Sequence, residues 1–581
     1  MRIALVLAAA LVAASPQAQT PPADPLAETG PGDRYFPPAF LQRSASIAPN
    51  VMAATSHPLA TQVALDVMRQ GGNAIDAAIA ANAAIGVLEP TGNGIGGDLF
   101  AIVWSAEDEK LYGLNASGRA PQGVTLDQVR ADLGADAEEI STRHPHSITV
   151  PGAVSGWFAL HEQFGSAPMT GLLAPAVAYA RDGAPVPQYI AALWSRSRSL
   201  AAQPGFAETF LPDGQAPREG QMFRNPDLAR TLERVAAGGR AAFYEGEVAA
   251  ATEAFCARVG CFLTAEDFAA HEATWVDPVG VTYRDYTLWE LPPNGQGIAA
   301  LQMLQLLQPY DLEAMGHNSA AYLHHLVEAK KIAYEDRARY YADPAFSEIP
   351  VGTLVSADYA DRRRTLLDPE RAGTEFDPGD PRAGRGGTIY LAVGDSEGNM
   401  ISLIQSNYAG FGTGYVPDGL GFSLQNRGAG FSLEPGHPNA YAPGKRPFHT
   451  IIPGFITRDE RPYMAFGVMG GDMQPQGHVQ VFLNHVVFGM DPQAAGDVAR
   501  FRHQGSTSPT GTLRPMADGG CLAMESGVGE AVRDQLAAMG HQACTGSWVH
   551  YGGYQAVMWD AEEGVYWGAT ESRVDGQAAG Y

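Results

Sequence analysis

The sequence has few cysteines and few charges, and it contains no hydrophobic run long enough to cross a membrane. Charged residues make up only 17% of the 581 residues, while 45% are hydrophobic. This balance excludes a chain kept unfolded by its charge and a protein built from membrane-spanning helices. Basic residues are scarce, with 38 Lys and Arg against 63 Asp and Glu and a net charge of -25. Because such a charge repels phosphate backbones and anionic membrane surfaces, we expect no nucleic acid or membrane partner.

The sequence also lacks the usual metal-binding patterns. The His-Glu-x-x-His motif is absent, and the spacings of the four cysteines do not interlock into a zinc site. Two histidine pairs, His144 with His146 and His324 with His325, are better explained as surface or hydrogen-bonded side chains. We therefore expect neither a metal nor a cofactor.

The four cysteines form two pairs that are close in sequence, Cys256 with Cys261 and Cys521 with Cys544. A disulfide within each pair would form in an oxidising compartment. Free or buried thiols are the alternative, and the spacings alone do not decide between the two.

The N-terminus has the parts of a secretory signal. Arg2 precedes an apolar run over residues 3–14, and small residues follow over 15–18. The run is too short to span a bilayer, which favours a cleaved signal peptide over 1–19. An uncleaved anchor or a plain N-terminal helix is the alternative. A proline-rich leader over 20–50 would follow, and we expect a periplasmic or secreted protein.

Residues 92–97 read GNGIGG, which formally matches the G-x-G-x-x-G pattern of dinucleotide-binding proteins. Apolar periodicity predicts helices over 59–70 and 73–88 before this stretch and a strand over 99–104 after it. The dinucleotide pattern needs a strand first and a helix second. We therefore interpret the glycines as a tight turn. A long helix is also predicted over 319–342.

A loop rich in proline, glycine and charge over 367–387 ends abruptly at Thr388. Two strands, over 388–394 and 400–407, follow around a short turn. Symmetric pairing about this turn places Thr388 opposite Ser406. Taken alone, the segment is also explained as a linker that runs into an ordinary hairpin.

Several motifs occur in order on both sides of this hairpin. The longest read HPLATQVALDVMRQGGNAIDAAIAANAAIGVLEPTGNGIGGD at 57–98 and GTIYLAVGDSEGNMISLIQSNY at 387–408; shorter ones lie at 150–157, 242–249, 283–298, 411–414, 444–453, 467–472, 500–504 and 578–581. This order resembles the γ-glutamyltransferase family, also called γ-glutamyltranspeptidases or glutathione hydrolases, among the N-terminal nucleophile hydrolases. The resemblance covers nearly all of the chain from about residue 50.

The resemblance implies an α+β fold, a four-layer αββα sandwich of the N-terminal nucleophile hydrolase type. It also implies self-cleavage between Gly387 and Thr388, which gives a large chain over 51–387 and a small catalytic chain over 388–581 that stay associated. The Thr388 hydroxyl would attack the preceding carbonyl and form an ester, whose hydrolysis frees the α-amine of Thr388. That amine, with a reference pKa of about 7.7–8.0, can then act as base for the hydroxyl of the same residue.

The resemblance assigns three further residues to the reaction. Ser406 falls at the position whose hydroxyl orients the nucleophile, in agreement with the hairpin register. Gly470 and Gly471 align with the glycine pair whose backbone N–H groups hold the developing oxyanion, and glycine leaves that approach open. A plain turn is the alternative explanation of the glycine pair.

The substrate-binding positions depart from the family. Ser117 replaces an Arg that binds the substrate carboxylate, and Arg119, two residues on and on the same face of a straight strand, is the candidate substitute. Gly430 replaces an Asp that holds the substrate amino group, and Glu434 is the nearest acid. By the same resemblance, His449 and Thr450 replace a Ser-Ser pair that contacts the carboxylate. Tyr408, with Asn407 beside it, replaces an Asn near the nucleophile, and Arg427 is an added cation where the family often has a neutral amide.

Three functions follow as hypotheses. The first is a γ-glutamyltransferase or glutathione hydrolase, which passes the acyl group of a small γ-glutamyl amide to water or to an amine acceptor. The missing Asp and the added Arg427 favour a plain dicarboxylate acyl group, so a glutaryl or cephalosporin acylase is the second. The third is an unprocessed, non-catalytic binding protein, whose chain would remain uncut.

Overall fold

The computed structural model describes residues 43–134, 136–376, 387–512, 514–544 and 551–581. The expected signal peptide over 1–19 and most of the expected leader over 20–50 lie outside the described residues. The side chain of Thr388 lies outside them as well, whereas its backbone is described as part of a strand. Residues 44–581 form one unit by themselves.

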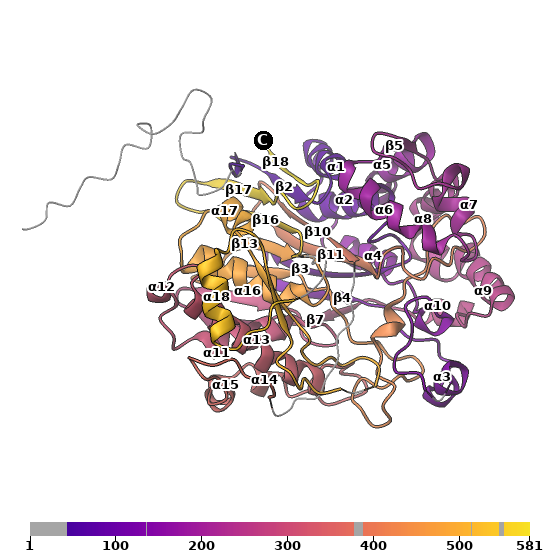
Figure 1. Ribbon diagram of the computed structural model, residues 1–581. Coiled ribbons are helices and arrows are strands. Elements are labelled where there is room, and N and C mark those ends of the chain that lie inside the picture. The colour runs from indigo at the N-terminus through magenta and orange to yellow at the C-terminus, as the bar shows by residue number, and fades with distance from the viewer. Residues whose placement is uncertain (1–42, 135, 377–386, 513, 545–550) are drawn as a thin grey trace, which may run out of the picture. The chain divides into compact units, whose positions relative to one another are not determined.

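Two seven-stranded antiparallel sheets form the centre of this unit (Figure 1). The first sheet has, in spatial order, β1 (Ser46–Ala48), β17 (Val565–Thr570), β16 (Tyr554–Asp560), β13 (Arg461–Val468), β12 (Gly454–Arg458), β9 (Tyr286–Glu290) and β8 (Val279–Tyr283). The second has β18 (Gln577–Gly580), β2 (Met52–Thr55), β10 (Gly387–Gly394), β11 (Met400–Tyr408), β3 (Asp98–Ser105), β4 (Lys110–Ala116) and β7 (Thr274–Val276). The sheets pack face to face, because β10 and β11 contact β13.

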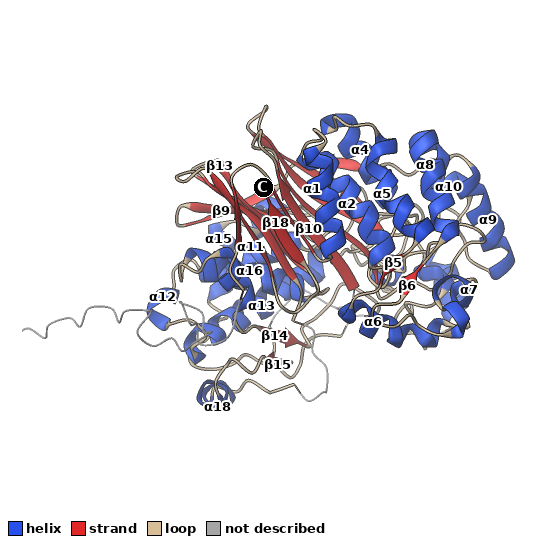
Figure 2. Ribbon diagram, turned by 90° about the horizontal axis from the view of Figure 1, so that it is seen from above, coloured by secondary structure: helices blue, strands red, loops and turns tan. Residues whose placement is uncertain are grey.

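Helices cover the outer face of each sheet (Figure 2). The second sheet is contacted by α1 (Pro58–Arg69), α2 (Ala74–Leu88) and α4 (Ala153–Phe164), and α5 (Met169–Asp182) and α8 (Pro226–Tyr244) pack on these helices. The first sheet is contacted by α11 (Gly297–Leu307) and α16 (Met473–Val486), and α13 (Ala320–Tyr340) packs on α11. The layer order is therefore helix, sheet, sheet, helix. This arrangement confirms the expected α+β fold and four-layer αββα sandwich.

The remaining elements lie around these layers. They are α3 (Leu126–Leu133), α6 (Gln188–Ser195), α7 (Phe206–Phe210), α9 (Glu247–Val259), α10 (Ala265–Ala269), α12 (Leu312–Met315), α14 (Val351–Leu354), α15 (Ala357–Arg364), α17 (Pro492–Asp497), α18 (Glu530–Ala538) and the strand pairs β5 (Ala184–Pro185) with β6 (Met222–Phe223) and β14 (Phe501–Gln504) with β15 (Cys521–Met524). Short 3-10 helices include η2 (Arg196–Leu200) and η4 (Arg427–Gly430).

Helix α2 shows why the local patterns predicted the elements well. All of its residues are buried, and most are Ala or Ile, so the helix packs on every side between α1, α5 and the second sheet. A capping box fixes its start, because Asn73 accepts from the N–H of Asp76 and the Asp76 carboxylate accepts from the N–H of Asn73. The predicted helices over 59–70, 73–88 and 319–342 are confirmed.

The chain enters the fold earlier than expected. Strand β1 pairs Ser46 with Gly568 and Ala48 with Tyr566 of β17, although we expected an unpaired leader as far as residue 50. The Ser46 hydroxyl also donates to the carbonyl of Ala578 at 2.7 Å. Three residues are too few to show the alternation of apolar and polar side chains that predicts a strand. Both of these contacts come from residues near the C-terminal end of the chain.

The hairpin register agrees with the prediction for most of its length. Ile389 pairs with Gln405 and Gly394 with Met400, as symmetric pairing requires. The register then shifts between Gly387 and Ile389, so the backbone of Thr388 lies at an irregularity. On its other side, β11 pairs Ser406 with Asp98 of β3.

Both sheets contain strands from before and from after residue 387. In the second sheet, β2 lies between β18 and β10, and β11 is followed by β3. In the first sheet, β1 and β9 flank strands that all come from the C-terminal part of the chain. Cleavage before Thr388 would therefore leave two polypeptides that share both sheets.

Both cysteine pairs form disulfides, Cys256 with Cys261 and Cys521 with Cys544. The pairing that the spacings left open is thus settled in favour of bonded cysteines. Among the residues that the structure describes, no helix is both long enough and apolar enough to cross a membrane.

Candidate active site

Ser406, near the end of β11, accepts two hydrogen bonds. The backbone N–H of Tyr408 donates to its Oγ at 2.8 Å, and Nη2 of Arg427 donates at 3.2 Å. A hydroxyl oxygen has two lone pairs and one hydrogen, so these two donors leave the O–H to act as a donor. The local geometry therefore fixes Ser406 as a hydrogen-bond donor towards its third partner.

Arg427, at the start of η4, is fully buried beside Ser406. Its Nη1 donates to Oγ1 of Thr450 at 2.8 Å, and its guanidinium lies 4.3 Å from the ring centroid of Tyr408. Burial lowers the pKa of Arg427 to about 10, so it remains a cation at neutral pH. Within the described part of the chain, no carboxylate forms an ion pair with it. The site thus keeps a positive charge without a direct counter-ion.

Asp98 and His449 form a buried pair next to this cation. Nε2 of His449 lies 3.0 Å from Oδ2 of Asp98, while Oδ1 accepts from the N–H of Gly118 and from Gln425. Burial raises the pKa of Asp98 to about 7, although the charge of Arg427 opposes that rise. Burial, together with the nearby Arg427, holds the pKa of His449 well below its usual value. His449 is therefore a neutral imidazole that donates to Asp98.

Gly470 and Gly471 connect β13 to α16 and have φ values of 125° and 62°. Both lie in the region that favours glycine. Within the described residues, their N–H groups donate no hydrogen bond, whereas the Gly471 carbonyl accepts from Nε2 of Gln296 at 2.9 Å. The same Gln296 Nε2 donates to the carbonyl of Thr450 at 2.7 Å. Two N–H donors are thus held in place and are available to an oxyanion.

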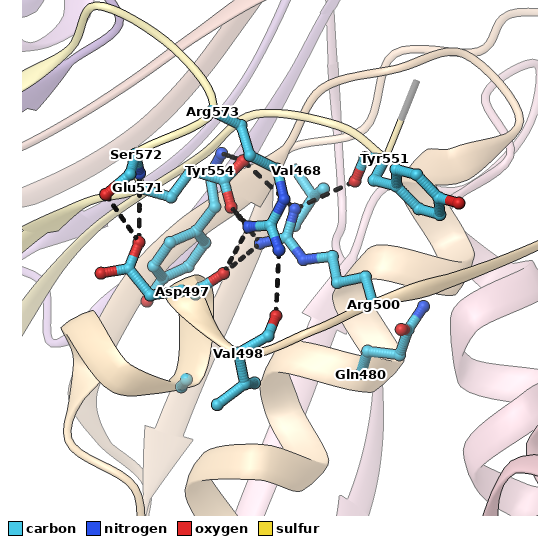
Figure 3. Close-up of polar contacts among 12 residues, drawn as sticks. Val468, Gln480, Asp497, Val498, Arg500, Tyr551, Tyr554, Glu571, Ser572 and Arg573 are labelled. Carbon is cyan, nitrogen blue, oxygen red and sulfur yellow. Dashed lines mark hydrogen bonds and ion pairs between the residues drawn. The ribbon is translucent and has the colours of Figure 1, made fainter. Parts of the chain in front are cut away.

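A buried ion network supports the segment beside these glycines (Figure 3). Arg500 pairs with Glu571 and donates from Nη1 to the carbonyl of Tyr551 at 3.0 Å. Two residues later, the carbonyl of Gly553 accepts from the N–H of Met469 at 2.9 Å. The network therefore holds the chain that positions Met469, the residue before Gly470.

A cavity of about 380 Å³ opens at this point. Its volume lies in the range of about 300–1,000 Å³ that is typical of small-molecule sites. Ile389, the residue after Thr388, and Gly470 both line it. The rest of the wall contains apolar, cationic and acidic side chains, among them Leu193, Leu200, Phe411, Met469, Val574, Arg143, Arg196, Arg502, Tyr189 and Glu89.

The structure does not bring Arg119 to the Ser406 cluster. Its Nη1 lies 3.7 Å from Oδ2 of Asp343 and 3.3 Å from the carbonyl of Gly444, and the side chain is 29% exposed. Ser117 is buried and bonded to Asn115. No described contact joins Arg119 to Ser406, and its binding role stays a prediction.

The other expected binding residues lie close together. Tyr408, Arg427, His449 and Thr450 are all buried, and the contacts given above join them. Asn407 is also buried; its N–H donates to the carbonyl of Gly92, and its Oδ1 has no hydrogen-bond partner among the described residues. Side chains of the protein therefore occupy much of the space around Ser406.

Sequence reasoning missed several residues of this site. Asp98 directly follows the glycine turn, and its pairing opposite Ser406 is a tertiary relationship that the sequence did not indicate. Arg143, Arg196 and Glu89 belong to loops and helix ends far apart in the sequence. No spacing pattern could have predicted that they share one cavity.

One further cluster has the side chains of a metal site. Ligand-type atoms of His324, Glu328 and His541 lie within 4.8 Å of one another. Their placement has another explanation, since Nδ1 of His324 and Nε2 of His541 are hydrogen-bonded at 2.8 Å and Lys331 pairs with Glu328. The adjacent ammonium would also repel a metal cation. The interpretation of His324 as a hydrogen-bonded side chain is confirmed.

Comparison with known proteins agrees with this geometry. The sequence model of the family described as "Gamma-glutamyltranspeptidase" matches residues 60–581. The glutathione hydrolase-like YwrD proenzyme of Bacillus subtilis is 34% identical over 91% of this chain and 98% of its own, and the oxamate amidohydrolase proenzyme of Klebsiella pneumoniae is 35% identical over 93% and 100%. The crystal structure of cephalosporin acylase from Bacillus halodurans is similar with a TM-score of 0.85 and 39% identity, covering 95% of this chain and 99% of that one. The chain therefore belongs to the γ-glutamyltranspeptidase family of amide hydrolases and transferases.

Proposed function

We propose that the chain is a self-processing amidohydrolase and acyltransferase with Thr388 as its N-terminal nucleophile. One observation carries the proposal: the backbone of Thr388 is the second residue of β10 and comes immediately before Ile389, which lines the same cavity as Gly470. A substrate carbonyl in that cavity could meet a nucleophile from β10 and two N–H donors from the glycine pair. The proenzyme names of the two relatives support processing.

Processing would use the same hydroxyl as catalysis. Thr388 Oγ1 adds to the carbonyl carbon of Gly387, and the peptide C–N bond breaks as the ester C–O bond forms. Water then hydrolyses the ester, which leaves a carboxylate on Gly387 and a free α-amine on Thr388. The large chain over 51–387 and the small chain over 388–581 would stay associated through their shared sheets.

In each turnover, the α-amine of Thr388 would accept the proton of Oγ1 as the oxygen attacks the substrate amide. The tetrahedral oxyanion would accept from the N–H groups of Gly470 and Gly471. The amine product takes the proton and leaves an ester on Thr388. Water or a second amine then attacks that ester, so hydrolysis and transfer share one intermediate. Ser406 would donate its O–H to the nucleophile oxygen.

The acyl group that we propose first is γ-glutamyl, as in glutathione. The family match over 60–581 and the glutathione hydrolase-like relative support it. The positive charge of Arg427 suits the carboxylate of such a group. We propose Asn407, Tyr408, Arg427, His449, Thr450 and Arg119 as residues that shape or charge this part of the site.

A specific observation favours a second candidate, a glutaryl or cephalosporin acylase. An ideal Cβ on Gly430 would lie 2.7 Å from the carbonyl oxygen of Phe448, so this position has no room for the acid that holds a substrate ammonium in the family. A glutaryl group has no ammonium and needs no such partner. The structural similarity to a cephalosporin acylase agrees with this candidate.

The test compares γ-glutamyl-4-nitroanilide, glutaryl-4-nitroanilide and glutathione with the purified, processed protein. Release of 4-nitroaniline or glutamate that depends on Thr388 supports the amidohydrolase, and the ratio of kcat/KM for the two anilides identifies the acyl group. Absence of turnover with all three substrates, in a protein whose chain is uncut, would leave the non-catalytic binding protein.

We also propose that the enzyme works in the periplasm or outside the cell. The apolar run over residues 3–14 and the two disulfides support this location. N-terminal sequencing of the exported protein would show where the leader is removed.

A further inference from the structure

Gln296, the residue before α11, joins three parts of the site through one side-chain amide. It is fully buried, and its Oε1 accepts from Nη1 of Arg337 at 2.6 Å. Because a guanidinium has donors only, this contact identifies the amide oxygen and directs Nε2 the other way. Nε2 uses its two hydrogens on the carbonyls of Gly471 and Thr450, at 2.9 and 2.7 Å. Arg337 therefore determines the orientation of the Gln296 amide.

Arg337, in α13, also holds the residue that follows the glycine pair. The same Nη1 donates to Oδ1 of Asp472 at 2.8 Å. The side chain of Arg337 is fully buried, and that of Asp472 is 13% exposed. A carboxylate next to the glycine pair would oppose a negative charge that develops there, and the guanidinium compensates it.

Tyr334 lies one turn before Arg337 on α13 and holds the backbone of the same residue. Its hydroxyl donates to the carbonyl of Asp472 at 2.5 Å, and the centre of its ring lies 3.8 Å from the Arg337 guanidinium. Two neighbouring side chains of α13 thus bind Asp472, one at its carboxylate and the other at its carbonyl. These contacts fix the chain at the point where α16 begins.

The two glycines need support from outside their own segment. Gly470 and Gly471 have φ values of 125° and 62°, and a glycine leaves such a conformation as readily as it adopts it. Their carbonyls accept from the N–H groups of Met473 and Gln474, at 3.2 and 3.0 Å. On the other side, the N–H of Met469 is bonded at 2.9 Å. The pair is thus held at both ends, and the contacts from α13 and Gln296 hold the end that leads into α16.

The supporting side chains lie on the other side of the expected cleavage site. Gln296, Tyr334 and Arg337 precede residue 387, whereas the glycine pair follows it. After cleavage, the large chain would therefore hold the segment of the small chain that receives the oxyanion.

We propose that Arg337 and Gln296 are positioning residues for the oxyanion, which hold the glycine pair so that its N–H groups point at the developing charge. This inference rests on the proposed function, because the direction of these N–H groups matters only if a carbonyl reacts beside them. Neither side chain would touch the substrate. The Gln296 amide also holds the carbonyl of Thr450, whose hydroxyl accepts from Arg427, and so joins the glycine segment to the Ser406 side of the site.

The first test removes the amide. Gln296→Met keeps a side chain of similar length, and the processed variant is assayed with γ-glutamyl-4-nitroanilide and glutaryl-4-nitroanilide. With the anilide that the wild type prefers, we expect kcat to fall at least about tenfold and KM to change less than about twofold, because the oxyanion forms only in the transition state. The matched control is Gln302→Met, which removes another buried amide, one within α11 that donates to Asp336. It should keep the wild-type kcat.

The second test changes the guanidinium. Arg337→Met should lower kcat at least as much as loss of the amide, and Arg337→Lys should recover part of that loss. Lys keeps the charge beside Asp472 but lacks the planar fork that meets two acceptors. The matched control is Arg363→Met, which breaks an ion pair with Asp336, the neighbour of Arg337 on α13. It should lower Tm and leave kcat unchanged.

Amide hydrogen exchange measures the positioning without any turnover. The N–H groups of Met473 and Gln474 report on the glycine carbonyls to which they are bonded. In the uncut Thr388→Ala background, Gln296→Met should raise the exchange rate of these two amides at least about tenfold, because the segment opens more often. Gln302→Met should leave the rate unchanged.

Three outcomes would overturn the inference: unchanged exchange in Gln296→Met, faster exchange without a fall in kcat, or an equal loss of kcat in Gln302→Met. A wild type that turns over neither anilide would count against the Thr388 chemistry alone. The exchange of Met473 and Gln474 would then still decide whether the amide holds the glycine pair.

Discussion

Arg427 donates a hydrogen bond from Nη2 to Oγ of Ser406 across 3.2 Å, inside a site where both side chains are buried. The bond helps to set the direction of the Ser406 hydroxyl and places a cation beside it. A hydrogen bond from a charged group contributes about 1.5–3 kcal/mol. We therefore expect this contact to be a large part of the electrostatic stabilisation in the site.

Arg427→Gln should lower kcat by about 10- to 100-fold, which corresponds to the loss of one charged hydrogen bond. Gln is neutral and shorter than Arg, and folding and chain cleavage of the variant are checked in the same preparation. Arg427→Lys, which keeps the charge, should lose less. Steady-state kinetics with the preferred anilide measures both, and an unchanged kcat in Arg427→Gln would remove Arg427 from the reaction.

Thr388→Ala should abolish both cleavage and amidase activity, because one hydroxyl performs both steps. Intact mass under denaturing conditions should show a fragment from Thr388 to Tyr581 in the wild type and one uncut chain in the variant. Retained cleavage in Thr388→Ala would contradict the assignment of the nucleophile. Thr388→Ser, which keeps a hydroxyl, is the control and should still be cut.

Arg119→Ala tests a residue that the structure places away from Ser406. If Arg119 binds the substrate carboxylate equally in the ground and transition states, the variant raises KM and leaves kcat unchanged. Its contact with Asp343 offers a competing structural role. Measuring KM and Tm of the same variant decides between the binding role and the structural role. An unchanged KM with a lower Tm would show that Arg119 stabilises the fold and does not bind the substrate.

His57 should make stability sensitive to acid. Its Nδ1 accepts from the N–H of Leu59 and caps α1, and burial lowers its pKa to about 4. Between pH 6.5 and pH 4 the unfolded chain binds this proton and the folded chain does not, so stability is present above pH 6.5 and is lost as pH falls. His57→Asn keeps a capping acceptor without titrating and should reduce the slope by up to about 1.4 kcal/mol per pH unit.

The measurement is urea unfolding at several pH values between 4 and 7, carried out in the uncut Thr388→Ala background so that one polypeptide unfolds. Equal slopes for His57→Asn and its parent would show that His57 takes up its proton without unfolding.

The Cys521–Cys544 disulfide spans 23 residues and ties β15 to the segment after α18. Replacing both cysteines by Ala should lower the free energy of unfolding by about 3 kcal/mol, since the bond restricts the unfolded chain. The Cys256–Cys261 bond spans only 5 residues and should contribute about 2 kcal/mol. Denaturant unfolding of the two double variants compares them, and a larger loss for the shorter bond would contradict this account.

Local patterns were sufficient for elements that depend on their own residues. The capping box at Asn73, the apolar periodicity of α13 and the symmetric turn after Gly394 each contain their own signal. Strand β1 has no such signal, because its pairing partner, β17, lies more than 500 residues away. Formation of this three-residue strand therefore depends on pairing with β17.

The same distinction applies to the site. Motifs whose order resembles a known family indicated Ser406, Gly470 and Gly471, whose roles stay predictions. Asp98 and Glu89 could not, because each depends on tertiary burial rather than on a sequence pattern. For Arg119, the sequence predicted a side chain on the substrate-binding face of a strand. In the structure Arg119 lies against Asp343, and no described contact joins it to Ser406.

Strand β2 lies between β10 and β18, and β9 follows β12, so the two products of cleavage before Thr388 would be interleaved in both sheets. Their separation would require several backbone ladders to open at once, which makes dissociation as slow as global unfolding. Reassembly would then become a second-order reaction that depends on protein concentration, whereas the uncut precursor folds as one molecule. Cleavage would thus convert a reversible fold into a kinetically trapped one, and the enzyme's working lifetime would be set by its rate of unfolding.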